Sequence, residues 1–294
     1  MAASLTPLSS EGAIDHNLFS NHLHWLLDNG CDAAVLFGTT GEGNSFSVAE
    51  RQSALEAIIE DGIPVDRLMV ATGCCAVTDT LSLTSQALDL GVDSVLVLPP
   101  FYYKTVSDQG LYDYFAQLID RIGDSRLKLY LYHFPKMAIV SFSPELIGKL
   151  QDAYPEIIVG IKDSTGDYDH TLMLQTSFPD LKVFAGTEHF LLDYLRAGGA
   201  GCISATTNIT APYAARICSN LQGEDVEQLQ QQLSDIRELL QQFPLTGVLK
   251  GLLAELSGRE SWRNTRLPLH CLGQKPVADL ASSLAKLDFH LAYS

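Results

Sequence analysis

The stretch IIVGIKDSTGDYDHTLMLQT, residues 157–176, contains one complete strand, turn and helix. Residues 157–161 form an apolar, β-branched run, residues 163–167 are small and polar, and residues 168–176 have helical spacing. A short strand that is apolar on both faces is typical of a parallel sheet covered by helices. This unit therefore predicts a fold in which strands alternate with helical crossovers.

The same unit recurs along the chain. Apolar runs occupy residues 33–37, 68–71, 94–98, 128–132, 157–162, 182–186 and 201–204, and an incomplete run occupies residues 2–5. Helical patterns lie at residues 16–29, 48–61, 79–90, 109–122, 144–153, 168–176, 189–197 and 212–221. Eight strand–helix units predict an α/β (β/α)₈ TIM barrel over residues 1–223. An open, doubly wound sheet is the alternative, but its glycine-rich dinucleotide turn, GxGxxG, is absent.

Residues 224–294 follow the last unit and have a different pattern. They contain helical segments at 226–242, 245–256 and 278–287, without an apolar run between them. This region is predicted to be a C-terminal helical extension that packs on the barrel.

Composition excludes several classes of protein. The 294 residues are 46% hydrophobic and carry a net charge of −16, which indicates a globular chain and argues against a nucleic-acid or anionic-membrane partner. No apolar run approaches the roughly 20 residues that span a bilayer, and the N-terminus lacks the features of a signal peptide, so we expect a cytoplasmic protein. The six cysteines form no CxxC pair and the eight histidines form no HExxH motif, so no metal site is predicted.

Lys162 ends the apolar run of residues 157–162. Chemistry in a (β/α)₈ barrel lies where the strands end, and burial there disfavours the ammonium form of a lysine. A neutral amine can condense with a ketone to form a Schiff base, which is an electron sink for making or breaking a neighbouring C–C bond. The alternative is a structural lysine that reaches solvent or pairs with Asp163.

Three other strand ends carry candidate groups. The turn of residues 38–43, GTTGEG, presents backbone N–H groups and the hydroxyls of Thr39 and Thr40, which can bind a carboxylate, although it could equally be a plain loop. Tyr132 ends the fifth strand, where core packing is the alternative to an acid/base role. Tyr103 lies in the loop PPFYYK, whose aromatic residues can form an interface or supply a phenol to a pocket.

Six motifs in chain order together resemble the dihydrodipicolinate synthase/N-acetylneuraminate lyase superfamily of class I, pyruvate-type aldolases. They are GTTGE at 38–42, PPFYYK at 99–104, YHFP at 132–135, GIKDSTGD at 160–167, AGTE at 185–188 and GCIS at 201–204. The resemblance covers nearly the whole chain and implies a (β/α)₈ barrel with a C-terminal helical extension. It also implies a homotetramer built as a dimer of dimers, with no cofactor other than the covalent imine on the lysine.

The resemblance further implies a role for each matching residue. Lys162 is the lysine that forms the Schiff base with pyruvate or another 2-oxo acid, and Tyr132 is the acid/base group beside the imine. Thr39 and Thr40 bind the carboxylate, and Thr40 also belongs to a proton relay, a chain of hydroxyls that runs from Tyr132 through Thr40 to Tyr103. Tyr103 completes this relay from a neighbouring subunit. Gly186 and Ile203 shape the pocket through backbone contacts.

Two positions depart from dihydrodipicolinate synthase. Where that enzyme has an arginine for the carboxylate of aspartate semialdehyde, this chain has Met137, and His133 replaces the usual asparagine. A thioether cannot bind a carboxylate. Lys136 is adjacent to Met137, but a shift by one residue is expected to turn it in another direction.

We therefore expect a Schiff-base lyase or aldolase that cleaves or dehydrates a sugar-acid-derived 2-oxo-3-deoxy acid, with pyruvate and an aldehyde as partners. Dihydrodipicolinate synthase itself, condensing pyruvate with aspartate semialdehyde, is the alternative enzyme. A non-catalytic protein that binds 2-oxo acids is the alternative of another class. A metal-dependent aldolase would need a ligand cluster that the sequence does not show.

Overall fold

The centre of the molecule is one parallel sheet whose strands follow one another in chain order. The computed structural model describes residues 1–291 and 293. Neighbouring strands pair in parallel throughout, from β1 to β7. The strands within the described part of the chain are β1 (Ala2–Ala3), β2 (Ala34–Leu36), β3 (Leu68–Ala71), β4 (Ser94–Val97), β5 (Lys128–His133), β6 (Ile158–Asp163) and β7 (Lys182–Ala185).

The sheet closes on itself through the segment of residues 201–204. Cys202 bridges to Ala185 at the end of β7, and Ser204 bridges to Ala2 of β1. The predicted (β/α)₈ barrel is therefore confirmed. The predicted eighth strand is present only as these two isolated bridges, because Gly201 has a φ of +111° and a helix begins at Thr207.

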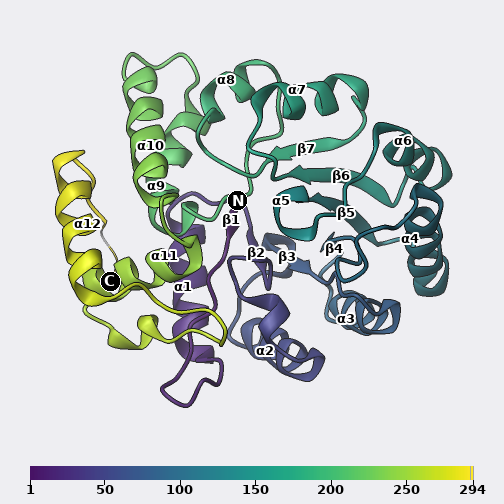
Figure 1. The fold of residues 1–294 in the computed structure, drawn as a ribbon, viewed down its shortest axis with the longest axis horizontal. Coiled ribbons are helices and arrows are strands. Elements are labelled where there is room, and N and C mark those ends of the chain that lie inside the picture. The colour runs from purple at the N-terminus through teal and green to yellow at the C-terminus, as the bar shows by residue number, and fades with distance from the viewer. Residues whose placement is uncertain (292, 294) are drawn as a thin grey trace.

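Helices surround the strands, as Figure 1 shows, and they agree with the helical patterns in the sequence. They are α1 (His16–Asp28), α2 (Val48–Glu60), α3 (Val77–Asp89), α4 (Asp108–Ile122), α6 (Pro144–Ala153), α7 (Tyr168–Ser177), α8 (Leu191–Arg196) and α9 (Thr207–Ser219). Helix α9 begins five residues before the predicted start, and the short helix α5 (Pro135–Ala138) was not predicted.

The C-terminal extension consists of α10 (Val226–Leu240), α11 (Leu245–Ser257) and α12 (Gln274–Lys286), which lie to one side of the barrel in Figure 1. Their apolar side chains form a second cluster that also contains Leu5 and Ile209 of the barrel. The boundary between 223 and 224 stays a prediction, because this cluster joins residues from both sides of it. None of the helices in the described residues is long and apolar enough to cross a membrane.

Candidate active site

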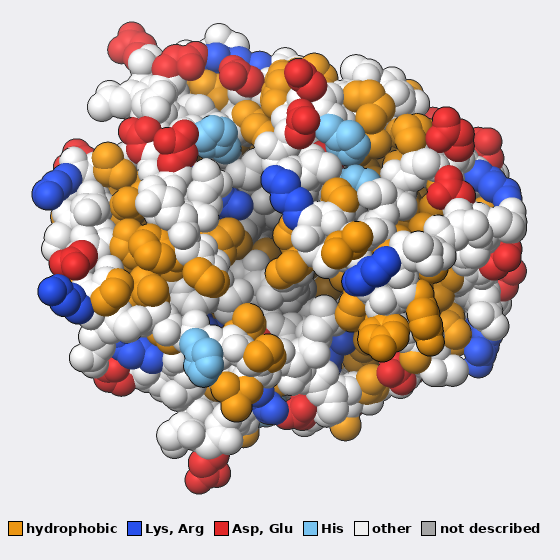
Figure 2. Space-filling view, viewed as in Figure 1, with side chains coloured by type: hydrophobic (Ala, Val, Ile, Leu, Met, Phe, Trp, Pro, Cys, Tyr) orange, Lys and Arg blue, Asp and Glu red, His pale blue; other side chains and the backbone are white. Residues whose placement is uncertain are grey.

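A cavity of about 870 Å³ lies at the carboxyl ends of the strands. Figure 2 shows a hollow near the centre of this face, with Lys, Arg and His side chains around its rim. The cavity brings together most of the site residues predicted from the sequence: Thr39, Thr40, Tyr132, Met137, Lys162, Gly186 and Ile203. Tyr103 and His133 are not part of its lining.

Lys162 is buried and projects from β6 into this cavity, with 5% of its surface exposed. Its Nζ lies 4.5 Å from the centroid of the Tyr132 ring. Within the described residues, the side chain of Lys162 has neither a hydrogen bond nor an ion pair; its ammonium group contacts only the Tyr132 ring. The amine is therefore held beside the phenol and left available for a ligand.

Asp163, the next residue, is not the partner of Lys162. Successive strand residues point to opposite faces, so the Asp163 carboxylate lies behind the sheet. Its Oδ2 accepts hydrogen bonds from Thr165 Oγ1 (2.8 Å) and Thr171 Oγ1 (2.7 Å) and contacts His170 Nδ1 at 3.0 Å. Its Oδ1 accepts from the Thr165 backbone N–H at 3.1 Å. Lys162 and Asp163 therefore do not form the ion pair that was the structural alternative for this lysine.

Tyr132 places its hydroxyl among the threonines of the turn after β2. Its Oη lies 3.3 Å from Thr39 Oγ1, and its ring stacks on Phe134 at a centroid distance of 5.7 Å. We expected Thr40 to be the neighbour of this hydroxyl, but the structure pairs Thr39 with it. Thr40 is buried, and its carbonyl oxygen accepts a weak hydrogen bond from Thr246 Oγ1 at 3.4 Å.

The turn of residues 38–43 is fixed by close backbone packing. A Cβ on Gly41 would lie 2.7 Å from the Ser4 carbonyl oxygen, and one on Gly43 would lie 1.7 Å from the Phe37 carbonyl oxygen. Between them, Glu42 has a left-handed φ of +58°. Glycines are therefore required here to bring the loop against the barrel.

Gly186 lines the same cavity and directly follows β7. A Cβ there would lie 2.4 Å from Ser164 Oγ and 2.8 Å from the Asp163 carbonyl oxygen. The Gly186 backbone N–H donates to the same carbonyl at 2.6 Å. Gly186 therefore lets the loop after β7 approach the loop after β6 at the cavity wall.

Both Lys136 and Met137 line the cavity. The expectation that Lys136 points elsewhere was wrong, because residues 135–138 form one turn of helix rather than an extended strand. Neighbouring residues of a helix are about 100° apart, so two of them can face one cavity. Met137 lies at the mouth and is 58% exposed.

His133 lies behind β5 and not in the cavity, so a direct contact with substrate is not supported by its position. The reason is the alternation of strand side chains, since Tyr132 points inward. His133 stacks on His170 at a centroid distance of 5.2 Å. Burial lowers the pKa of His133; the nearby carboxylate of Asp163 acts in the opposite direction.

His133, Asp163 and His170 have potential metal-ligand atoms within 4.8 Å of one another. Their hydrogen bonds do not fit a metal site. The Phe142 backbone N–H donates to His133 Nδ1 at 3.2 Å, so a neutral His133 carries its proton on Nε2 and has no free lone pair for a metal. The Asp163 carboxylate is already occupied by hydroxyl and imidazole donors.

The C-terminal extension supplies residues of the cavity that the sequence did not identify. Arg237 and Gln241 line it from the end of α10, together with residues 244–247 and 268–270. Basic side chains line the cavity at Lys136, Lys162 and Arg237, whereas its lining contains no Asp or Glu among the described residues. In a chain with a net charge of −16, this favours an anionic ligand.

Arg237 is held at the cavity wall by hydroxyl groups. Its Nη1 donates to Ser204 Oγ and Thr206 Oγ1, both at 3.2 Å, while its buried Nε has no hydrogen-bond partner in the described chain. Burial lowers the pKa of the Arg237 guanidinium, and the charge of nearby Glu188 opposes this shift. The spacing of Arg237 and Gln241, one turn apart on α10, is the signal that could have placed both on one helix face.

The Glu188 carboxylate is the centre of this hydroxyl network. It is buried, and it accepts hydrogen bonds from Ser204, Thr206, Thr207 and Thr210. The hydroxyls of Ser204 and Thr206 bridge the Glu188 carboxylate to Arg237. Arg237 lines the cavity, whereas Glu188 does not, so the hydroxyls and the guanidinium separate the negative charge from the cavity.

Tyr103 lies outside the cavity in the single chain. It is 73% exposed, and its ring contacts that of Tyr102 at a centroid distance of 5.1 Å. Tyr102 and Ile139 are also mostly exposed. An exposed cluster of this kind is typical of an interface.

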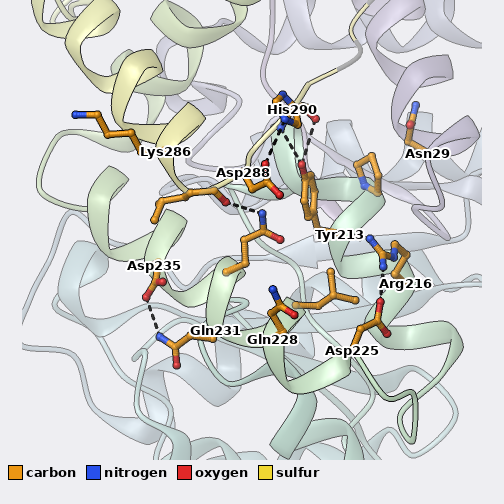
Figure 3. A pocket seen from close by; sticks show the side chains of 14 residues that line it. Asn29, Tyr213, Arg216, Asp225, Gln228, Gln231, Asp235, Lys286, Asp288 and His290 are labelled. Atoms are coloured by element: carbon orange, nitrogen blue, oxygen red, sulfur yellow. Dashed lines mark hydrogen bonds and ion pairs between the residues drawn. The ribbon is translucent and has the colours of Figure 1, made fainter.

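A second hollow, of about 730 Å³, lies between α9, α10 and α12 and is shown in Figure 3. Arg216 and Asp225 of its lining form an ion pair, and Asp235 accepts a hydrogen bond from Gln231 Nε2 at 2.8 Å. Tyr213 Oη accepts from the His290 backbone N–H at 2.8 Å. None of the predicted site residues lies in this hollow.

Comparison with known proteins agrees with this arrangement. A sequence model of the dihydrodipicolinate synthetase family matches residues 1–286. The chain belongs to this family. An uncharacterized DapA-like lyase of Chloroflexus aurantiacus is 36% identical over 290 residues, which cover 98% of this chain and 96% of the relative.

Solved structures show the same fold. The dihydrodipicolinate synthase of Agrobacterium tumefaciens superposes with a TM-score of 0.90 at 31% identity, over 97% of this chain and 98% of that chain. YagE, a prophage protein of the dihydrodipicolinic acid synthase family from E. coli K12, was solved in complex with pyruvate; it has a TM-score of 0.86 at 25% identity, with 97% of each chain covered.

The family consists of class I lyases and aldolases, so the chain is an enzyme of this class and not a non-catalytic binder of 2-oxo acids. The predicted superfamily is thereby confirmed. The second substrate is not determined by family membership, since one relative is named a DapA-like lyase (36% identity) and another a 4-hydroxy-tetrahydrodipicolinate synthase (27% identity, Coxiella burnetii).

Proposed function

We propose that this enzyme forms a Schiff base between Lys162 and a 2-oxo acid and cleaves a sugar-acid-derived 2-oxo-3-deoxy acid to pyruvate and an aldehyde. The observation that supports it most directly is the buried, unpaired amine of Lys162, 4.5 Å from the centroid of the Tyr132 ring, in a cavity lined by cations.

In this proposal the Lys162 amine attacks the C2 carbonyl, and loss of water from the carbinolamine gives the iminium. Breaking the C3–C4 bond sends its electron pair into the iminium and gives an enamine, while the C4 hydroxyl loses its proton and becomes the aldehyde. Protonation of the enamine at C3 and hydrolysis of the imine release pyruvate and free Lys162.

Tyr132 is the group placed to move these protons. Its hydroxyl contacts Thr39 Oγ1 at 3.3 Å, which supports a relay from Tyr132 to Thr39 rather than to Thr40. Thr40 and the N–H groups of the turn of residues 38–43 then remain for the substrate carboxylate. Tyr103 of a second copy completes the relay in a homotetramer, a role supported by its exposure in the single chain.

The distal part of the cavity favours a polar substrate. Arg237, His189 and Gln241 line it. The Arg237 guanidinium, which lines the cavity, could donate to a hydroxyl or a second anionic group of the substrate. No cofactor is required for the proposed steps.

The test is reduction by borohydride in the presence of pyruvate, followed by intact mass. One irreversible pyruvate adduct is expected on the wild type and none on Lys162→Met, which keeps the length and the apolar stem of the side chain. An unlabelled wild type, or a labelled Lys162→Met variant, would exclude the mechanism. Activity should persist in EDTA.

Dihydrodipicolinate synthase is the second candidate, because Lys136 lines the cavity next to Met137. An ammonium group here could bind the carboxylate of aspartate semialdehyde, where the sequence alone showed only a thioether. Relatives named 4-hydroxy-tetrahydrodipicolinate synthase, another name for this activity, are 27–31% identical.

The ratio of kcat/KM for the two reactions on one preparation separates these candidates. We expect cleavage of a 2-oxo-3-deoxy aldonate to exceed condensation with the semialdehyde. If condensation is faster by tenfold or more, Lys136→Met should reduce it by about tenfold to a hundredfold, the loss of one charge-assisted hydrogen bond.

A further inference from the structure

A buried ion pair joins the turn after β2 to the C-terminal extension. The side chains of Glu42 and Lys250 are both fully buried, and the Lys250 ammonium contacts Glu42 Oε1. Lys250 Nζ also donates to the Asn264 carbonyl oxygen at 2.7 Å. The second carboxylate oxygen, Glu42 Oε2, accepts the Arg266 backbone N–H at 2.7 Å.

Glu42 belongs to the same short turn as the threonines of the site. Its backbone N–H donates to the Thr39 carbonyl oxygen at 3.2 Å. Thr246, at the start of α11, contacts the Thr40 carbonyl oxygen at 3.4 Å. The extension therefore contacts this turn at two points, and the position of the Glu42 side chain constrains the backbone on which Thr39 and Thr40 lie.

The same carboxylate constrains a second wall of the cavity. Arg266 shortly precedes Pro268, Leu269 and His270, which also line the cavity. The side chain of Arg266 also donates to Glu50 of α2, so this segment is held between the barrel and the extension. Glu42 is thus the point at which the carboxylate-binding turn, α11 and residues 264–270 meet.

Stability alone does not account for two buried charges at this position. Burial lowers the pKa of Lys250, while Glu42 acts to raise it, so the ammonium depends on its partner. Apolar residues of similar volume often replace a buried ion pair without loss of stability, whereas the pair specifies one geometry. The ion pair between Glu42 and Lys250 lies beside the candidate active site, which is consistent with a role in fixing the position of the neighbouring backbone.

We propose that Lys250 is a positioning residue for the 2-oxo acid: through Glu42 it holds Thr39 and Thr40 where they bind the substrate carboxylate. The inference rests on the proposed function, because it assigns the turn of residues 38–43 to that carboxylate. Lys250 itself does not line the cavity, so it acts through Glu42 and not on the substrate.

The test compares Lys250→Met with the wild type in the borohydride reaction. The pyruvate concentration that gives half-maximal labelling of Lys162 is measured, together with the maximal labelling rate, well below the melting temperature of each variant. A displacement of the turn by about 1 Å can reduce productive binding strongly. We expect the half-maximal concentration to rise at least tenfold, with the maximal rate changed less than threefold.

Leu249→Ala is the matched control for a loss of stability. Leu249 is the preceding residue of α11, is fully buried in the second apolar cluster and does not line the cavity. This variant should have a lower melting temperature and an unchanged half-maximal pyruvate concentration. A change within twofold in Lys250→Met, or an equal rise in Leu249→Ala, would overturn the proposal.

The double variant Glu42→Gln/Lys250→Met buries no charge and serves if Lys250→Met does not fold. It should fold and show the same rise in half-maximal pyruvate concentration. Normal pyruvate binding in the double variant, or its failure to fold, would overturn the proposal, since the pair would then serve folding alone. A wild type that is not labelled at all would instead refute the proposed function, so the two failures are distinguishable.

Discussion

Acid should destabilise the fold through His22, a fully buried histidine of α1. Its Nε2 lies 2.8 Å from Asn208 Oδ1 and its Nδ1 lies 3.0 Å from Tyr293 Oη. Asn208 Oδ1 also accepts the Leu5 backbone N–H, so it is an acceptor and His22 Nε2 is the donor. This hydrogen bonding fits the neutral ring, and burial makes the charged ring costly.

Burial lowers the pKa of His22 from 6.5 to about 4, although the hydrogen bond to Asn208 acts in the opposite direction. Because the unfolded chain binds a proton more readily than the folded one, stability is complete above pH 6.5 and falls as the pH drops towards 4. A pKa difference of about 2.5 pH units corresponds to about 3 kcal/mol at most. About 2 kcal/mol of this should be lost at pH 5.

Urea unfolding at pH 7.5 and pH 5.0, followed by tryptophan fluorescence, measures this loss. Both tryptophans of the chain, Trp25 and Trp262, lie within about 6 Å of the His22 ring centroid and report on this region. The difference in unfolding free energy between the two pH values should be about 2 kcal/mol smaller in His22→Gln than in the wild type.

His24→Gln is the matched control, because His24 lies on the same helix and is exposed. It should leave the pH dependence unchanged. His133 also has a pKa lowered by burial, so part of the acid sensitivity will remain in His22→Gln. If the wild type and His22→Gln lose the same stability between pH 7.5 and 5.0, His22 is not the group whose protonation destabilises the fold.

Three further predictions concern the site. Tyr132→Phe keeps the ring that stacks on Phe134 and should keep its melting temperature, but kcat should fall by about 10²–10⁴; a kcat within threefold of wild type would return Tyr132 to a packing role. Gly186→Ala places a Cβ 2.8 Å from the Asp163 carbonyl oxygen, so the free energy of unfolding should fall by about 1–3 kcal/mol and pyruvate should bind more weakly. Unchanged pyruvate binding in a titration would show that the loop at Gly186 does not shape the pocket. If Tyr103 acts across an interface, specific activity should fall on dilution as tetramers dissociate in sedimentation velocity, and a fully active monomer would contradict this.

The barrel was predictable because each unit contains its own signal. In residues 157–176 the apolar run, the polar turn and the helical spacing define β6, the loop and α7 within one or two residues. The segment of residues 201–204 was also predicted to be a strand but forms only two bridges. Its pairing depends on the first and seventh strands, which lie far away in the sequence, so no local pattern could determine its length.

The start of α9 shows a different limit. Pro212 favoured a helix that begins there, because proline is common in the first turn and rare in the interior. The helix nevertheless begins at Thr207, with Pro212 inside it. Thr207 and Thr210 donate to the buried carboxylate of Glu188, which is a tertiary contact that fixes the preceding turn and that no local pattern contains.

The residues that we propose to be catalytic were predicted from the strand ends, whereas the cavity residues that could bind a second substrate were not. Lys162, Tyr132, Thr39 and Gly186 each occupy a position that the barrel rule directs towards the cavity. Arg237 and Lys136 do not, since one comes from the extension and the other from a single helical turn. We expected the shift of one residue from Met137 to turn Lys136 away from the cavity. Residues 135–138 instead form a helical turn, and the 100° spacing of its residues allows both Lys136 and Met137 to line the cavity. Under the proposed function, we therefore expect the choice between cleavage of a sugar-derived acid and condensation with a charged semialdehyde to depend on the conformation of residues 135–138, and not on the identity of residue 137 alone.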